Sequence, residues 1–289
     1  MSDQAQSLRN LILTRQASSV KNTRVITVTS GKGGVGKSNF TLNFALTLQK
    51  RGYQVLIFDA DIGLANIDVL MGVASPYSLY HLLKKEKNIW DIIQTGPHGL
   101  RFIAGGSGFT DLLRLKDSEL DYFSDQISQL NGHVDFILFD TGAGLSKETL
   151  KFILAAHETF VVTTPEPTSI TDAYAIIKMV HSEEKNVPFR LVINRVSDDR
   201  EGLQTADKIR LVAKRFLQLD IPILGYVADD SSVTKAVKKQ TPFTVAFPGS
   251  PAARSLEELV DHFIKGQQME PVHTGGVKGF LHRMIRLLK

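Results

Sequence analysis

Residues 31–38 form the run Gly31-Lys32-Gly33-Gly34-Val35-Gly36-Lys37-Ser38, which fits the phosphate-binding pattern G-x-x-x-x-G-K-[ST]. A β-branched run at 25–29 precedes it and a helical pattern at 38–49 follows it, which is the context that this motif requires. The glycines let backbone N–H groups turn around phosphate oxygens, and the helix N-terminus adds a positive dipole. In this pattern Lys37 reaches the β- and γ-phosphates and the Ser38 hydroxyl binds Mg²⁺. The run therefore predicts a nucleoside triphosphate site, and not a turn that only joins a strand to a helix.

Short apolar runs alternate with helical patterns along the rest of the body. Near-continuous apolar runs are typical of parallel strands that are covered on both faces. We expect strands at 25–29, 55–58, 134–139, 160–163, 191–193 and 223–227. We expect helices at 38–49, 119–130, 147–155, 169–181, 202–217 and 255–264. This alternation predicts a doubly wound, mostly parallel α/β sheet of the P-loop NTPase type.

Carboxylates follow two of the expected strands. The strand at 55–58 leads into Asp59 and Asp61, and the strand at 134–139 leads into Asp140 and the glycine-rich run 141–144. Carboxylates at strand ends, across from a P-loop, stand where a metal ion and an attacking water must be held. We expect Asp140 to hold Mg²⁺ through a water molecule, and Asp59 to support the Mg²⁺ side. The glycines would let the loop move when the γ-phosphate is lost.

Lys32 is a second lysine that phosphate binding does not need. The narrower pattern K-G-G-x-G-K-[ST] resembles the deviant Walker A ATPases of the MinD/ParA group. The resemblance implies that Lys32 crosses a dimer interface and contacts the nucleotide bound by the partner subunit. Asp61 matches the switch I aspartate of that family, which orients or activates the attacking water. The resemblance thus implies slow hydrolysis of MgATP to ADP and phosphate, by Asp61, Lys32 and Lys37, in a homodimer that forms with ATP.

The base-binding residues are carried over from the same resemblance. The chain has no N-K-x-D run for guanine, and Asn194-Arg195 matches the adenine-side pair of the family. Asp229 falls in a second adenine-contacting loop, which many members begin with a proline that this chain lacks. Asn39 stands where threonine is common, and its amide can still donate to a phosphate oxygen. The expected nucleotide-binding residues are Gly31, Lys32, Gly33, Gly34, Val35, Gly36, Lys37, Ser38, Asn39, Asn194, Arg195 and Asp229.

The net charge of +4 on this 289-residue chain is concentrated at its two ends. Residues 1–24 carry +3, residues 271–289 carry +4, and the body between them carries −3. An acidic body lacks the cationic surface that nucleic-acid binding needs. The chain has no cysteine, which excludes a disulfide scaffold, a cysteine nucleophile, Cys-ligated zinc and Cys-bound iron–sulfur clusters.

The last segment, 277–289, has the pattern of an interfacial membrane helix. On a helical wheel its apolar residues fall within an arc of about 160°, opposite a basic face that contains no acid. MinD ends in a similar helix. We expect the following residues to contact an anionic membrane: Phe280, Leu281, Met284, Ile285, Leu288, Lys278, Arg283 and Arg286. The alternative is a terminal helix docked on the core, against which the linker-like run 266–276 and the uniform basic charge argue.

No apolar run approaches the ~20 residues that span a bilayer, and the first residues do not form a signal peptide. We therefore expect a cytoplasmic protein that binds reversibly to the inner face of the cell membrane. Among proteins of this group MinD begins almost at its first strand, whereas residues 1–24 precede the first strand here.

The opening run 3–9 resembles the D-Q-A-x-x-L-R element of the FlhG (YlxH/FleN) family of flagellar-number regulators. That resemblance implies a helix that binds the SRP-type GTPase FlhF and stimulates its GTP hydrolysis. Gln4 and Arg9 would make the polar contacts and Leu8 an apolar one. The alternative is a solvated start with no partner.

These patterns predict four segments, namely a partner-activating extension at 1–24, an ATPase domain at 25–265, a flexible linker at 266–276 and a membrane-targeting helix at 277–289. We expect a membrane-associated ATPase switch that sets flagellar number and placement, with FlhF and flagellar basal-body (C-ring) proteins as partners. One alternative is a MinD-type ATPase that positions cell division. A second is a ParA-type partition ATPase that binds DNA, which the acidic body disfavours.

Overall fold

The computed structural model describes residues 22–61, 66–105, 117–267 and 275–288. Its strands are β1 (Arg24–Ser30), β2 (Val55–Ala60), β3 (Gln94–Thr95), β4 (Arg101–Ile103), β5 (Phe136–Ala143), β6 (Glu158–Thr163), β7 (Phe189–Val196) and β8 (Ile223–Ala228). Its helices are α2 (Lys37–Lys50), α3 (Ile67–Met71), α4 (Leu79–Leu83), α5 (Ile89–Ile92), η1 (Pro97–Gly99), α7 (Asp117–Ser128), α8 (Lys147–Ala155), α9 (Pro167–Glu183), α10 (Asp199–Leu217), α11 (Ser231–Lys238), α12 (Phe243–Ala246), α13 (Pro251–Gln267) and α14 (Gly276–Leu288).

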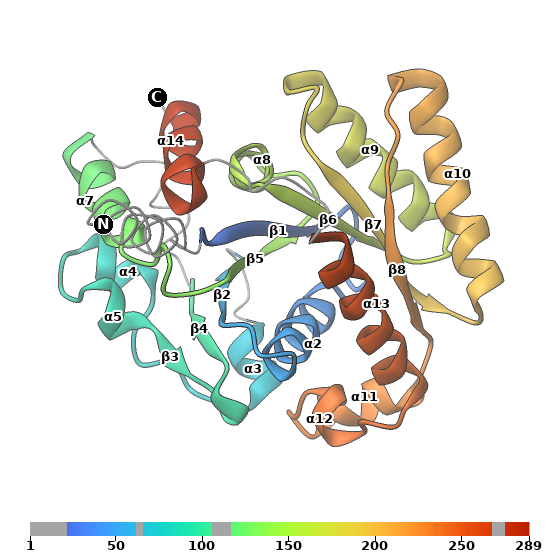
Figure 1. Ribbon diagram of the computed structural model, residues 1–289, viewed down its shortest axis with the longest axis horizontal. Helices are drawn as coiled ribbons and strands as arrows, with labels where there is room; N and C mark the ends of the chain where they lie inside the picture. Colours follow the sequence, from blue (N-terminus) through green and yellow to red (C-terminus); the bar gives the residue numbers. More distant parts are fainter. Residues whose placement is uncertain (1–21, 62–65, 106–116, 268–274, 289) are drawn as a thin grey trace, which may run out of the picture.

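The strands form one sheet in the order β3-β4-β2-β5-β1-β6-β7-β8, with helices on both of its faces (Figure 1). Neighbouring strands run parallel except β3 and β4, which are antiparallel. The prediction of a doubly wound, mostly parallel α/β sheet is confirmed. All six expected strands are present, whereas β3 and β4 were not expected, because strands of two or three residues carry too short a pattern.

Strand β5 continues past its apolar run. Asp140 pairs with Val28 of β1 and with Asp59 of β2, and the strand ends only at Ala143. The parallel neighbours hold this polar end in the sheet through their ladder hydrogen bonds. The carboxyl ends of β1, β2 and β5 therefore lie side by side at one edge of the sheet.

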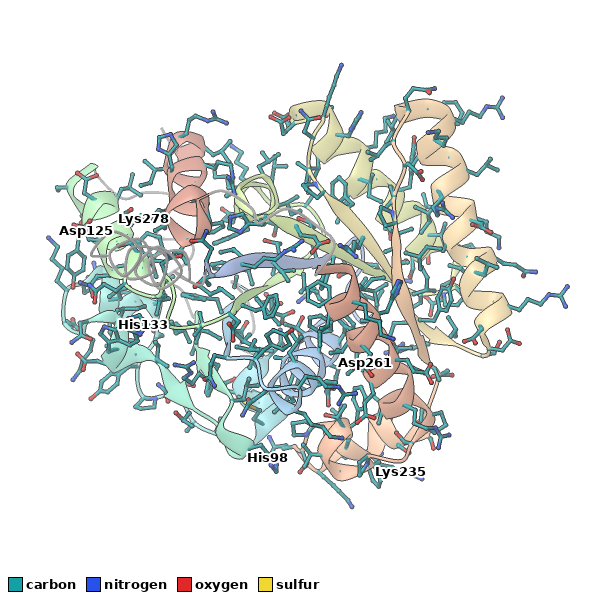
Figure 2. The ribbon with its side chains drawn as sticks, in the orientation of Figure 1. His98, Asp125, His133, Lys235, Asp261 and Lys278 are labelled. Atoms are coloured by element: carbon teal, nitrogen blue, oxygen red, sulfur yellow. The ribbon has the colours of Figure 1, made fainter. Side chains whose placement is uncertain are left out.

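Helix α2 is fixed to the sheet by aromatic side chains. Phe44 lies with its ring centroid 5.5 Å from that of Phe160 and 5.4 Å from that of Phe263, which belongs to α13. At the far end of α2, Arg51 donates to both carboxylate oxygens of Asp261, a residue of α13 that Figure 2 labels. These contacts hold the helix that follows the P-loop in one position.

Helix α14 packs on the body, next to α7 and α8 (Figure 1). Its apolar face is buried, since Val277, Phe280, Leu281 and Met284 are each at most 2% exposed and belong to the core. The Phe280 ring stacks on Phe139 of β5, with 5.1 Å between the centroids. The expectation that this helix stands apart from the body is therefore wrong for this structure.

Polar contacts also hold α14 in place. The Arg283 side chain donates from Nε to the carbonyl of Ala155, at the C-terminus of α8, at 2.9 Å. Helix C-termini favour cations, so this basic residue supports docking. Lys278 (Figure 2) and Arg286 remain exposed on the other face. Basic charge did not argue against docking, because it can stay in water while the apolar face is buried.

Thr23, just before β1, and Val277, at the start of α14, both contact the loop 129–134. The Thr23 hydroxyl donates to the carbonyl of Val134 at 2.7 Å and accepts from the amide of Gly132 at 2.9 Å. The Asn131 side chain accepts from the amide of Val277 at 3.2 Å.

The boundaries of the expected linker change, because α13 continues to Gln267 and α14 begins at Gly276. Gln4, Leu8 and Arg9 lie outside the described residues, as do 268–274 and the side chain of Leu288. None of the helices that the structure describes combines the length and the apolar character of a membrane-spanning segment.

Candidate nucleotide-binding site

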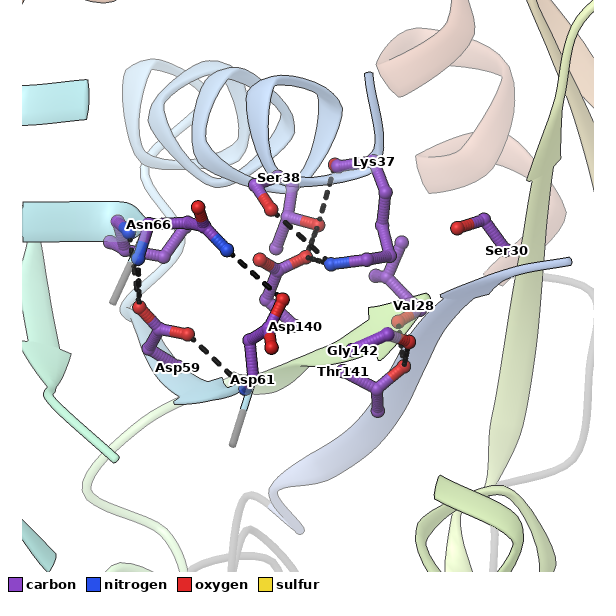
Figure 3. Close-up of polar contacts among 12 residues, drawn as sticks. Val28, Ser30, Lys37, Ser38, Asp59, Asp61, Asn66, Asp140, Thr141 and Gly142 are labelled. Carbon is purple, nitrogen blue, oxygen red and sulfur yellow. Dashed lines mark hydrogen bonds and ion pairs between the residues drawn. The ribbon is translucent and has the colours of Figure 1, made fainter. Parts of the chain in front are cut away.

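Lys37 lies at the centre of the candidate site. Its Nζ is 2.9 Å from Asp140 Oδ1 and donates to Ser38 Oγ at 3.2 Å (Figure 3). The two charged side chains are 7% and 0% exposed. The fold thus brings together the three residues that the sequence assigned to phosphate and Mg²⁺, because β5 is the neighbour of the strand that leads into the P-loop.

Gly31 and Gly36 show why the P-loop backbone needs glycine. Gly36 has φ +90°, a left-handed conformation, at the start of α2. A Cβ on Gly31 would lie 2.3 Å from the backbone carbonyl carbon of Asp172, so no other residue fits there. Residues 33–39, together with Asp61 and Arg195, line a cavity of about 460 Å³ on the phosphate side.

The two carboxylate oxygens of Asp140 differ in their hydrogen bonds. Its Oδ1 receives Lys37 Nζ and also the Thr41 hydroxyl, the latter at 2.8 Å. Its Oδ2 is buried and has no hydrogen-bond partner among the described residues. Carboxylate, hydroxyl and phosphate oxygens are the ligands that Mg²⁺ takes, usually with several waters. Asp140 and Ser38 therefore fit Mg²⁺, and a bound phosphate would have to supply further ligands, since the described residues contain no group of three or more His, Cys, Asp or Glu side chains that could hold a metal ion by themselves.

Asp59 lies beside Asp140 but faces the backbone that follows it. Its Oδ2 accepts from the amides of Asn66 at 2.8 Å and Ile67 at 3.1 Å, and its Oδ1 accepts from the amide of Asp61 at 3.3 Å. Burial raises the pKa of Asp59 to about 7, with a further contribution from the charge of Asp140. In the structure Asp59 therefore binds the backbone of Asp61, Asn66 and Ile67, and its contribution at Mg²⁺ stays a prediction.

Asp61 lies at the same edge, facing the glycine-rich run 141–144. Its Oδ2 accepts from the side-chain amide of Asn66 at 3.0 Å (Figure 3). A Cβ built on Gly142 would lie 3.4 Å from Asp61 Oδ1, so the carboxylate packs closely against this glycine. A carboxylate on the wall of the phosphate cavity is placed where an attacking water could be oriented.

Lys32 is bound within its own chain in this structure. Its Nζ donates to Glu166 Oε2 at 3.2 Å and to Thr168 Oγ1 at 3.0 Å, both at the start of α9. Glu166 and Thr168 were not expected at the site from the sequence. The available signal was their position after the strand at 160–163, because polar residues after parallel strands gather at the ligand-binding edge.

A second cavity, of about 500 Å³, continues from the P-loop towards α11 and α12. Asn194, Arg195 and Asp229, which the resemblance assigns to the adenine side, line it, and so do Glu166 and Phe243, which the sequence did not single out. The Asn194 amide donates to the Val35 carbonyl at 2.7 Å, which ties the end of β7 to the P-loop. This cavity has the position and size of a nucleoside pocket.

Known proteins similar to this chain include a P-loop NTPase family and two proteins with flagellar names. A family model described as "ParA: NUBPL iron-transfer P-loop NTPase" matches residues 21–264. The iron transfer in that description has no thiolate ligand in this chain, which contains no cysteine. The flagellum site-determining protein YlxH of Helicobacter pylori is 37% identical, with 100% of both chains covered. The antiactivator FleN of Pseudomonas aeruginosa is 33% identical, over 94% of this chain and 97% of its own length.

The solved structures share the fold. The septum site-determining protein MinD of Pyrococcus horikoshii, complexed with Mg-ADP, matches with a TM-score of 0.69 at 23% identity. The match covers 87% of this chain and 100% of that one.

Proposed function

Since this chain belongs to the ParA/MinD family of P-loop ATPases and hydrolyses ATP, we propose that it is a dimerising switch that regulates flagellar number from the membrane surface. The flagellar names of two relatives that match over nearly the whole chain support the biological role. The observation that carries the chemistry is the buried contact of Lys37 with Asp140 and Ser38, beside Asp61.

In the proposed reaction, the P-loop amides and Lys37 bind the phosphates of ATP. The ammonium group is already shielded from water, so its attraction for phosphate is stronger than that of a surface lysine. Asp61 would orient the attacking water, and Asn66 would hold the Asp61 carboxylate in place. Mg²⁺, held by Ser38 and by Asp140 through water, would neutralise charge on the phosphates.

Lys32 supports the proposal that ATP controls dimerisation. Its contact with Glu166 is exposed, and exposed ion pairs stabilise by only about 0–1 kcal/mol. Little free energy is therefore lost if Lys32 leaves Glu166 for a nucleotide bound by a second copy of the chain. Charge stabilisation of this kind is a major source of rate in phosphoryl transfer.

Helix α14 supports reversible attachment to the inner face of the cell membrane. Its apolar face would have to leave the body before it could insert among lipids, so docking opposes membrane binding. A single short helix binds lipid only marginally, and a dimer presents two. We therefore propose that dimerisation with ATP favours the undocked, membrane-bound helix.

This coupling predicts the behaviour of two variants. Asp61→Ala should bind ATP but not hydrolyse it, and should therefore accumulate as a dimer that co-sediments with anionic vesicles. Adding Lys278→Glu and Arg286→Glu should reduce this co-sedimentation at least about tenfold, because each basic residue near such a surface contributes about 1 kcal/mol. Size-exclusion chromatography and vesicle sedimentation measure the two effects. A monomeric Asp61→Ala protein in ATP would contradict the proposal, and so would full sedimentation of the triple variant.

The flagellar role rests on the N-terminal segment as well as on the relatives. A peptide of residues 1–24 is expected to raise GTP hydrolysis by FlhF, and the peptide with Gln4→Ala and Arg9→Ala to raise it much less. Phosphate release measures both. A peptide without effect on FlhF would favour the MinD-type alternative, in which this body positions cell division.

A further inference from the structure

Thr41 is a buried hydroxyl residue of α2 that points at Asp140. It is fully buried, and it lies one helical turn after Lys37. Its Oγ1 lies 2.8 Å from Asp140 Oδ1 and 3.0 Å from the carbonyl of Lys37. A hydroxyl has one hydrogen to donate, and the shorter contact is the one to a carboxylate, which forms the stronger hydrogen bond.

The two donors on Asp140 Oδ1 differ in what else they do. Lys37 is expected to bind the phosphates of the nucleotide. Its contact with Asp140 would weaken when the ammonium group turns towards them. Thr41 lies below Lys37 on a helix that Phe44 and Arg51 fix to the body, and it can keep its contact. One oxygen of the Asp140 carboxylate then stays held by Thr41, and the other, Oδ2, has no hydrogen-bond partner among the described residues.

We propose that Thr41 is a positioning residue of the ATPase, which holds the Asp140 carboxylate in the orientation needed for Mg²⁺ when Lys37 engages the phosphates. This inference rests on the proposed role of Asp140 at Mg²⁺. It concerns the orientation of that carboxylate and not the binding of the nucleotide itself. Loss of the Thr41 hydroxyl should therefore change the dependence on Mg²⁺ more than the affinity for nucleotide.

The test uses the full chain and the near-isosteric substitution Thr41→Val. We expect the Mg²⁺ concentration at half-maximal hydrolysis, and that at half-maximal Mg²⁺-dependent change in mant-ATP fluorescence, to rise about tenfold, as for loss of a hydrogen bond to a charged group. The affinity for mant-ATP without Mg²⁺ should change less than about twofold. Thr41→Ser, which restores the donor, should return both Mg²⁺ midpoints towards those of the unchanged protein.

Thr47→Val is the matched control. Thr47 is also a buried threonine of α2, and its hydroxyl donates only to the Asn43 carbonyl, at 2.8 Å, among the contacts of the described residues. An equal shift of the Mg²⁺ midpoint in Thr47→Val, or none in Thr41→Val, would overturn the inference.

Asp140→Asn separates this inference from the proposed function. If Asp140→Asn leaves the Mg²⁺ midpoint unchanged, the proposed role of Asp140 fails. If Asp140→Asn shifts the midpoint and Thr41→Val does not, only the role of Thr41 fails. Should Thr41→Val not fold, Thr41→Ser against Thr41→Ala decides, with the shift expected in the alanine variant alone.

Discussion

Lys37→Ala is expected to abolish ATP binding at working concentrations and to lower ATP hydrolysis by at least about a hundredfold. Lys37 is the buried cation on the phosphate side of the described site, and it contacts both Ser38 and Asp140. Its removal takes away the attraction for the phosphates and leaves the buried Asp140 carboxylate without its ion-pair partner. Isothermal titration with ATP and Mg²⁺ measures the affinity, and phosphate release measures the rate.

Lys50→Ala is the control for this prediction. Lys50 lies on the same helix, but its ion pair with Glu257 is exposed, so ATP affinity and hydrolysis should stay unchanged. Thermal unfolding without nucleotide shows whether Lys37→Ala is folded. If the variant is folded and binds ATP as tightly as the unchanged protein, the site assignment is wrong.

Phe280→Ala is expected to lower the free energy of unfolding by about 3–5 kcal/mol, which is typical of a buried phenylalanine. The ring is 2% exposed and stacks on Phe139, so its removal leaves a cavity between α14 and the sheet. Denaturation by urea, followed by circular dichroism without nucleotide, measures this change.

His282→Ala is the matched control, because His282 lies on the exposed face of the same helix. This substitution should lower the free energy of unfolding by less than about 0.5 kcal/mol. A Phe280→Ala variant as stable as His282→Ala would mean that α14 does not dock in solution. Because α14 is docked, a deletion of residues 277–289 would expose core side chains as well as remove the residues that we propose to bind the membrane.

The strand–helix alternation and the ligand-binding edge could be predicted from the sequence because their signals are local. The P-loop is a contiguous run, and Asp59, Asp61 and Asp140 each follow an apolar strand. Parallel packing then brings these residues together without further information. The structure confirmed the fold and brought Lys37, Ser38 and Asp140 into contact.

The remaining features depend on contacts between distant parts of the chain. Whether an amphipathic helix covers lipid or its own body cannot be read from its wheel, because both surfaces select the same apolar arc. The docking of α14 depends on Phe139 and on the carbonyl of Ala155, which lie far away in the sequence. In the same way, no local pattern links Thr41 to Asp140 or Lys32 to Glu166.

In the proposed switch, the docked helix would also determine how steeply membrane attachment responds to the nucleotide. If each α14 were undocked for a fraction f of the time, a monomer would bind lipid in proportion to f. A dimer that attaches through both helices needs both of them undocked at once. Its lipid binding would therefore be proportional to f². A modest change in docking on dimerisation would therefore produce a much larger change in membrane occupancy. The contacts of Phe280 and Arg283 with the body would in this way set the sharpness of the switch as well as its resting state.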